Sequence, residues 1–290
     1  MRDALLKQNR TIQFSLCVWG NARVEKWGNG TGHSWRMWAD IRPQWSSLAP
    51  IINQASFLWN TTNFWGHNDW DMMEVGNGKL TIEENRSHFA MWCALKSPLI
   101  IGTPMDSIKQ PIVDILSNKE LIDFSQDPVY GASAMPYKWG YNKDGTYDKL
   151  HPAEYWTGTS RKGIHVFMLN TQDKTVKMSS LFSEIPALKG LAYTEYLAHD
   201  MWEGQDIGSS QGNITLDVKS HDTAAIRITT VDGAYSPRGT KWYTADDTDR
   251  KTPKSYLDTA LAAIIAIYGI FTNIYSFFTR SSAPDLRANS

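Results

Sequence analysis

Short apolar runs alternate with helical patterns through the first 128 residues of the chain. Residues 11–19 are rich in β-forming side chains and predict a buried strand, and residues 35–41 predict a second strand. Residues 45–54 predict a helix, because their leucine and isoleucine side chains recur on one helical face. Residues 57–60 and 71–75 bracket a third strand region.

The alternation continues to the end of this segment. Thr81 and Glu84 have the spacing of a capping box, which predicts a helix that begins there and runs until Pro98 stops it. Residues 99–102 predict a short, fully apolar strand. Further helices are predicted over 107–116 and 119–124. We count four βα units, which make half of an eight-stranded barrel with a parallel sheet inside and helices outside.

After residue 128 the pattern changes to short strands separated by turns. Such strands are predicted over 154–158, 163–169, 175–178, 194–197, 213–218 and 224–228. Together they predict an antiparallel β-sandwich over residues 129–230. The predicted fold class is therefore α/β plus all-β, with the second half of a (β/α)8 TIM barrel over residues 1–128 and a C-terminal sandwich behind it.

Residues 231–290 fit neither domain. Residues 235–255 are polar and are typical of a linker. Residues 259–279 carry no charge and are long enough to cross a bilayer. Three interpretations of this apolar segment stay open: a membrane span, a buried helix or translated non-coding sequence. Association with a membrane is expected only if the segment is a genuine part of the protein.

Composition narrows the classes of function. A formal net charge of −1 argues against an electrostatic surface for nucleic acid. Nine of the 13 tryptophans precede residue 100, which favours a carbohydrate-binding cleft there, although core packing is the other use of a tryptophan. The two cysteines, Cys17 and Cys93, do not make a disulfide framework.

Signals for secretion conflict. Sequons at Asn29, Asn60, Asn85 and Asn213 weakly favour a secreted glycoprotein. Residues 1–10 contain no apolar stretch of the kind found in signal peptides and resemble the end of an amphipathic helix. We therefore expect that the chain begins inside a longer protein, and that the full-length form is secreted.

Two aspartates stand where barrel enzymes carry out chemistry. Asp40 and Asp71 each follow an apolar run, close to tryptophan, which places them at the carboxyl ends of predicted strands. Apolar walls raise the pKa of a carboxyl group, so that it can stay protonated and donate a proton near neutral pH. Tryptophan faces stack on sugar rings. The combination favours cleavage of a glycosidic bond, whereas Asp69 and Asp71 without a His or Cys cluster do not indicate a metal.

Three segments carry a family resemblance. Residues 14–20, 32–36 and 68–78 read FSLCVWG, GHSWR and NDWDMMEVGNG. In order and spacing they resemble the second half of the glycoside hydrolase family 27 α-galactosidases, and fungal members most of all. The resemblance covers roughly residues 10–130. It implies a barrel followed by a β-domain, retaining hydrolysis of terminal α-D-galactosides by double displacement, galactose-containing oligosaccharides or polysaccharides as substrates, and no cofactor.

The same resemblance implies roles for single residues. Asp40 falls at the acid/base position, and Arg36 at a position that contacts the 2-hydroxyl side of the sugar. The other substrate-binding positions are matched by Cys17, Trp19, Asp71 and Met72. Because positions four apart share a face of a strand, we expect Arg36 and Asp40 to point into one pocket. From the residues alone, a structural ion pair between Arg36 and Asp40 and a loop-capping role for Asp40 stay open.

Cys17 and Trp19 lie two positions apart and are expected on one strand face. Val18 departs from the acidic residue that many relatives have there, and Trp70 replaces a residue that is often proline.

The nucleophile that the family uses has no counterpart in this chain. Family members carry it on an earlier strand, in a Lys-x-Asp word, and no such word precedes Cys17. We therefore expect the 290-residue chain itself to be inactive. Two alternatives to an α-galactosidase stay open: an α-N-acetylgalactosaminidase on the same scaffold, or a vestigial, non-catalytic carbohydrate-binding protein.

Overall fold

The computed structural model describes residues 1–231, so the predictions for the linker and for residues 259–279 lie outside the described residues. In the first half, three parallel strands form a sheet in the order β1, β2, β3. These strands are Ser15–Leu16, Ser34–Arg36 and His67–Asp69. A fourth segment joins through a single parallel bridge between Met73 and Ile101.

The parallel strands are shorter than predicted. Because no described strand lies beyond β1, it forms the edge of the sheet, and Leu16 is the only buried residue of the predicted strand 11–19. The prediction of a buried strand there is wrong. Residues 99–102 contribute the one bridge. The third strand, β3, lies between residues 57–60, which belong to a helix end, and residues 71–75, as predicted.

Helices follow the strands, as the alternation predicts. They are α1 (Arg2–Leu6), α2 (Val24–Trp27), α3 (Trp45–Leu58), α4 (Ile82–Ala94), α5 (Gln110–Leu116) and α6 (Lys119–Ser125). Short 3₁₀ segments are η1 (Asn21–Arg23), η2 (Gly28–Gly30), η3 (Trp59–Thr61), η4 (Phe182–Glu184) and η5 (Pro186–Leu188). Within residues 1–231, no helix combines the length and the apolar character that crossing a bilayer requires.

The start of α4 confirms the predicted capping box. The hydroxyl oxygen of Thr81 accepts a hydrogen bond from the backbone N–H of Glu84 at 3.1 Å. In return, the carboxylate of Glu84 accepts one from the backbone N–H of Thr81 at 2.9 Å. Two backbone donors that the first turn leaves unpaired are thereby satisfied, which fixes where the helix begins.

The second half is built from antiparallel strands. They are β4 (Met135–Lys138), β5 (Tyr155–Ser160), β6 (Gly163–Leu169), β7 (Val176–Leu181), β8 (Glu195–Asp200), β9 (Gln205–Gln211), β10 (Asn213–Val218) and β11 (Thr223–Thr230). A six-stranded sheet has the order β4, β5, β6, β11, β8, β9, and a two-stranded sheet pairs β10 with β7. Sequence analysis missed β4 and β9, because Pro136 interrupts the first and the second has almost only exposed side chains.

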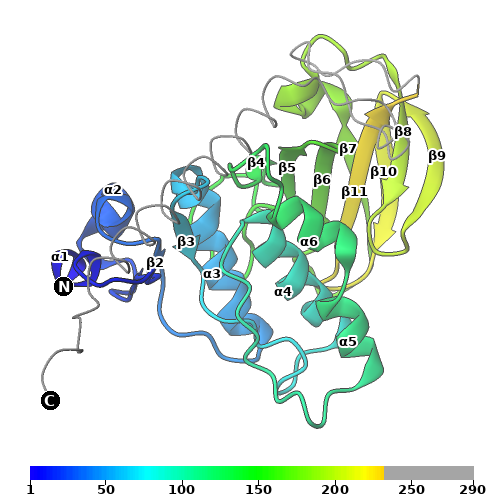
Figure 1. The fold of residues 1–290 in the computed structure, drawn as a ribbon. Coiled ribbons are helices and arrows are strands. Elements are labelled where there is room, and N and C mark those ends of the chain that lie inside the picture. Colours follow the sequence, from blue (N-terminus) through cyan, green and yellow to red (C-terminus); the bar gives the residue numbers. More distant parts are fainter. Residues whose placement is uncertain (232–290) are drawn as a thin grey trace, which may run out of the picture. The chain divides into compact units, whose positions relative to one another are not determined.

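One apolar core joins the two halves. Figure 1 shows α4 and α6 beside the strands β5, β6 and β11, and α4 contacts both β6 and β11. Phe89 and Phe124 from the helices belong to the same buried cluster as Trp156 and Phe167 from the six-stranded sheet. The rings of Phe124 and Phe167 meet edge to face at 5.4 Å between their centroids.

Polar contacts fasten the same junction. The hydroxyl of Ser87 on α4 donates to the carbonyl oxygen of His221 at 2.5 Å. The next residue towards the start of α4, Arg86, pairs with Asp222 at 3.0 Å and lies 4.2 Å from the ring centroid of Trp202. These partners are more than 110 residues apart in sequence, so the junction forms only when both halves are folded.

Lys96 follows α4 and is buried at this junction, with 3% of its surface exposed. Its ammonium group donates to the carbonyl oxygen of Tyr130 and lies 5.1 Å from the ring centroid of Phe124. Burial lowers the pKa of Lys96 from 10.5 to about 8, against the opposing attraction of Asp127. The folded chain therefore binds fewer protons than the unfolded chain between these two pKa values.

We expect the free energy of unfolding to gain a contribution from Lys96 as pH rises from 8 to 10.5, because the buried ammonium loses its charge there. Lys96→Met should remove this contribution, which amounts to at most about 3 kcal/mol. Urea unfolding of both proteins at pH 7 and pH 10 measures it. Lys143→Met, at an exposed lysine, is the matched control and should keep the wild-type difference. An unchanged difference in Lys96→Met would contradict the assignment.

Candidate active site

Three of the predicted site residues meet at the carboxyl ends of β2 and β3. Arg36 is the last residue of β2, and its side chain is 13% exposed. One guanidinium nitrogen, Nη2, lies 2.8 Å from Oδ1 of Asp40 and 2.5 Å from Oδ2 of Asp71. A single positive charge is thus shared by two carboxylates, at the end of the sheet where barrel enzymes bind their substrates.

Asp40 lies in the turn that follows β2, and its side chain is 68% exposed. Its Oδ1 accepts hydrogen bonds from Arg36 and, at 3.1 Å, from the indole N–H of Trp19. Within residues 1–231, Oδ2 accepts none. With 68% of this side chain exposed, the described residues do not enclose the carboxylate in the apolar walls that the sequence predicts.

The turn after β1 brings Trp19 to Asp40. The strand ends at Leu16, so the expectation that Cys17 and Trp19 share a strand face does not hold. Trp19 has a left-handed backbone with φ of 53°, and Gly20 follows with φ of 75°. The N–H of Gly20 donates to the carbonyl oxygen of Arg36 at 2.9 Å, which ties this turn to β2. Cys17 is exposed, and none of the hydrogen bonds that join the cluster involves it.

Asp71 is the buried member of the cluster, with 7% of its side chain exposed. Oδ2 accepts from the backbone N–H of Ile41 at 2.8 Å in addition to Arg36, and Oδ1 accepts from the N–H of Met72 at 2.8 Å. The backbone of Asp71 has φ of 86°. Met72 itself is half-exposed, and its sulfur packs against Gly102, where a Cβ atom would come within 2.9 Å of it.

Buried aromatic and acidic side chains hydrogen-bond to the backbone of Asp71. The indole N–H of Trp92 on α4 donates to the carbonyl oxygen of Asp71 at 2.7 Å, and Oδ1 of Asp69 accepts from its N–H at 2.9 Å. Burial raises the pKa of Asp69 above its ordinary value. Sequence analysis missed Trp92, because its spacing on an amphipathic helix has the pattern of any core residue. Trp70 is also buried, and its indole N–H has no hydrogen-bond partner among residues 1–231.

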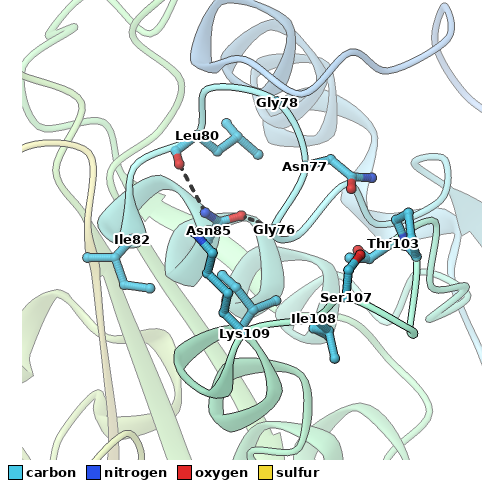
Figure 2. A pocket seen from close by; sticks show the side chains of 12 residues that line it. Gly76, Asn77, Gly78, Leu80, Ile82, Asn85, Thr103, Ser107, Ile108 and Lys109 are labelled. Atoms are coloured by element: carbon cyan, nitrogen blue, oxygen red, sulfur yellow. Dashed lines mark hydrogen bonds between the residues drawn. The ribbon is translucent and has the colours of Figure 1, made fainter.

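A separate pocket of about 370 Å³ opens between the loops after residues 75 and 101 and the starts of α4 and α5. Figure 2 shows that Asn85 lines one wall, accepting from the N–H of Gly76 and donating to the carbonyl oxygen of Leu80. None of the predicted site residues lines this pocket. Over the described part of the chain, no three His, Cys, Asp or Glu side chains gather in a way that could hold a metal ion.

Comparison with known proteins identifies the family. The family model described as "Alpha galactosidase A" matches residues 1–127, and the one described as "Alpha galactosidase C-terminal beta sandwich domain" matches residues 151–228. The chain belongs to the α-galactosidases of glycoside hydrolase family 27. The resemblance recognised from the three sequence segments is thereby confirmed.

Relatives within this α-galactosidase family are close but longer. A probable alpha-galactosidase B of Aspergillus oryzae is 53% identical over 232 residues, which are 79% of this chain and 52% of that protein. One of Penicillium simplicissimum is 52% identical over 230 residues, again 79% of this chain and 52% of that protein. The chain spans about half the length of the curated relatives it matches.

Solved structures of α-galactosidases share the fold. Alpha-galactosidase I from Mortierella vinacea has a TM-score of 0.69 and 27% identity, covering 79% of this chain and 61% of that one. The α-galactosidase from Saccharomyces cerevisiae, solved with raffinose, has a TM-score of 0.70 and 25% identity, covering 79% and 66%. The predicted fold class, a partial TIM barrel followed by an antiparallel β-sandwich, is confirmed.

Trp92→Phe should lower the free energy of unfolding by about 1–3 kcal/mol, because it leaves the buried carbonyl oxygen of Asp71 without its donor. Chemical denaturation of the 290-residue chain measures the loss. Trp65→Phe is the matched control, since Trp65 is 82% exposed and should change stability little. Equal losses in the two variants would contradict a structural role for the indole N–H.

Proposed function

We propose that the protein carrying this chain hydrolyses terminal α-D-galactosides with retention of configuration, and that Asp40 is its acid/base. The observation that supports this most directly is the unequal hydrogen bonding of the two oxygens of the Asp40 carboxylate. Oδ1 is held by Arg36 and Trp19, whereas Oδ2 is exposed and accepts no hydrogen bond within residues 1–231. One oxygen orients the group, and the other is left to carry the proton.

Asp40 would act twice in this reaction. In the first step it gives its proton to the glycosidic oxygen while the bond from that oxygen to the anomeric carbon breaks. A carboxylate nucleophile from outside the described residues forms a bond to the anomeric carbon. In the second step Asp40 takes a proton from water, the water oxygen bonds to the anomeric carbon, and the nucleophile leaves. Two inversions give retention.

Four of the remaining site residues, Arg36, Cys17, Trp19 and Met72, are proposed to bind the sugar. Arg36 offers donors to the 2-hydroxyl side, and Cys17, Trp19 and Met72 are exposed in the segments that follow β1 and β3 at the same end of the sheet. The raffinose bound in the Saccharomyces cerevisiae relative supports galactose-containing oligosaccharides as the substrate class. No cofactor enters the proposed mechanism.

Secretion and glycosylation of the full-length protein are part of the same proposal. Asn29 and Asn60 are exposed and could carry glycans. Asn85 is buried, and its side chain accepts from the N–H of Gly76 and donates to the carbonyl oxygens of Leu80 and Thr81, so its sequon is not an acceptor in the folded protein.

We expect Asp40→Asn to reduce hydrolysis of raffinose by about 10²–10⁴-fold, because the leaving sugar then departs without a proton. A suitable enzyme is a hybrid in which residues 1–231 replace the matching half of the Aspergillus oryzae relative. The same variant should lose much less activity in the glycosylation step on a dinitrophenyl α-galactoside, because that leaving group departs without a proton. Asp144→Asn, at an exposed aspartate, serves as the control. Normal raffinose turnover by Asp40→Asn would refute the acid/base assignment.

The 290-residue chain by itself should not turn over an aryl α-galactoside. In the Arg36 cluster, both oxygens of Asp71 are already hydrogen-bonded, so Asp40 is the only carboxylate there that can react, whereas double displacement needs two. The measurement is release of the aryl alcohol by purified chain of verified mass. Turnover that disappears in Asp40→Asn would show that the chain is active alone, and would overturn this expectation.

A further inference from the structure

We infer that Asp71 is a positioning residue for Asp40 and does not itself bind the sugar. The inference rests on the proposed acid/base role of Asp40. It starts from the hydrogen bonds of the Asp71 carboxylate, which is buried. Three donors point at its two oxygens: the guanidinium of Arg36 at 2.5 Å, the N–H of Ile41 at 2.8 Å and the N–H of Met72 at 2.8 Å.

A sugar hydroxyl would have to displace one of these donors. Two of them are backbone N–H groups and the third is a charged group, and leaving any of them buried and unpaired costs free energy. A carboxylate that binds a sugar needs an oxygen without a protein donor. Asp40, whose side chain is 68% exposed and whose Oδ2 accepts no hydrogen bond within residues 1–231, has one. Both oxygens of the Asp71 carboxylate instead accept hydrogen bonds from the protein itself.

The partners of Asp71 lie on both sides of Asp40. Arg36 touches Asp71 and Asp40 through the same nitrogen, so Asp71 fixes the group that orients the Asp40 side chain. The N–H of Ile41 belongs to the peptide that follows Asp40, so the same carboxylate also fixes the Asp40 backbone. Side chain and backbone of the proposed acid are therefore held by one residue.

Asp71 is in turn held in a conformation that few residues adopt. Its φ of 86° lies in the left-handed region, where a side chain other than that of glycine is strained. The bonds from Trp92 to its carbonyl oxygen and from its N–H to Asp69 keep it there. In this backbone conformation the carboxylate reaches Arg36 and the N–H of Ile41, as a positioning residue must.

The electrostatic attraction of Arg36 also links the two carboxylates. Arg36 divides its attraction between two carboxylates, and removing the charge of Asp71 leaves the guanidinium to Asp40 alone. The guanidinium would then be fixed from one side only, so it could turn away from the position in which it orients the Asp40 side chain. Loss of Asp71 should therefore weaken proton donation, even though Asp71 does not touch the substrate.

The first test needs no activity and uses the 290-residue chain. Asp71→Asn keeps the size and tolerates the left-handed backbone, but it offers one oxygen where Asp71 offers two. We expect amide hydrogen exchange at Ile41 or Met72 to become at least about tenfold faster, since the remaining oxygen cannot face both. Glu74→Gln, on the same loop, should leave both rates unchanged. Wild-type rates at both amides in Asp71→Asn would overturn the inference.

The second test separates positioning from sugar binding in the hybrid enzyme. Asp71→Asn should lose about 10²-fold in kcat/KM on raffinose and less than about tenfold on the dinitrophenyl galactoside, with unchanged inhibition by free galactose. Adding Asp71→Asn to Asp40→Asn should cause little further loss, because both changes remove the same step.

Equal losses on the two substrates with weaker galactose inhibition would assign Asp71 to the sugar and overturn the inference. A wild-type hybrid that is folded but hydrolyses neither substrate would count against the proposed function instead. The amide exchange in the 290-residue chain would then still decide whether Asp71 holds the backbone at Asp40.

Discussion

One guanidinium group held between two carboxylates organises the carboxyl end of the parallel sheet. Arg36 at the end of β2 contacts Asp40, which follows the same strand, and Asp71, which follows β3. Because the guanidinium is planar with donors in fixed directions, it sets the two carboxylates relative to each other. The turn after β1 joins this cluster through the bond from Trp19 to Asp40, so segments that follow all three described strands of this sheet take part in it.

This arrangement gives the two acids different surroundings. Asp71 is enclosed, strained and hydrogen-bonded at both oxygens, whereas Asp40 is largely exposed and one of its oxygens accepts no hydrogen bond from residues 1–231. Acids that share a cation but differ in exposure can take different roles, one structural and one chemical. The contrast comes from the backbone: β3 continues into the buried segment that packs on α4, while β2 runs out into an exposed turn.

Sequence reasoning reached the local features and the family, and it missed what depends on distant partners. The capping box at Thr81 and the bounds of β6 and β10 follow from patterns of neighbouring residues. The exposure of Asp40 and the bond from Trp92 to Asp71 do not, because they depend on packing between elements far apart in the chain. β9 was missed for a related reason: its side chains are exposed, so it has no apolar alternation.

The core shared by the helices and the six-stranded sheet limits how this architecture can be recombined. Phe124 on α6 and Phe167 on β6 fill one space, and Ser87 on α4 binds the backbone at His221. A sandwich taken from another protein would present side chains that do not fit the faces of these helices. Gene fusions and exchanges that cut between the two halves should therefore be selected against, unless the helix faces change with the sheet. The sandwich would then be inherited as a fixed companion of these helices and not as an interchangeable module.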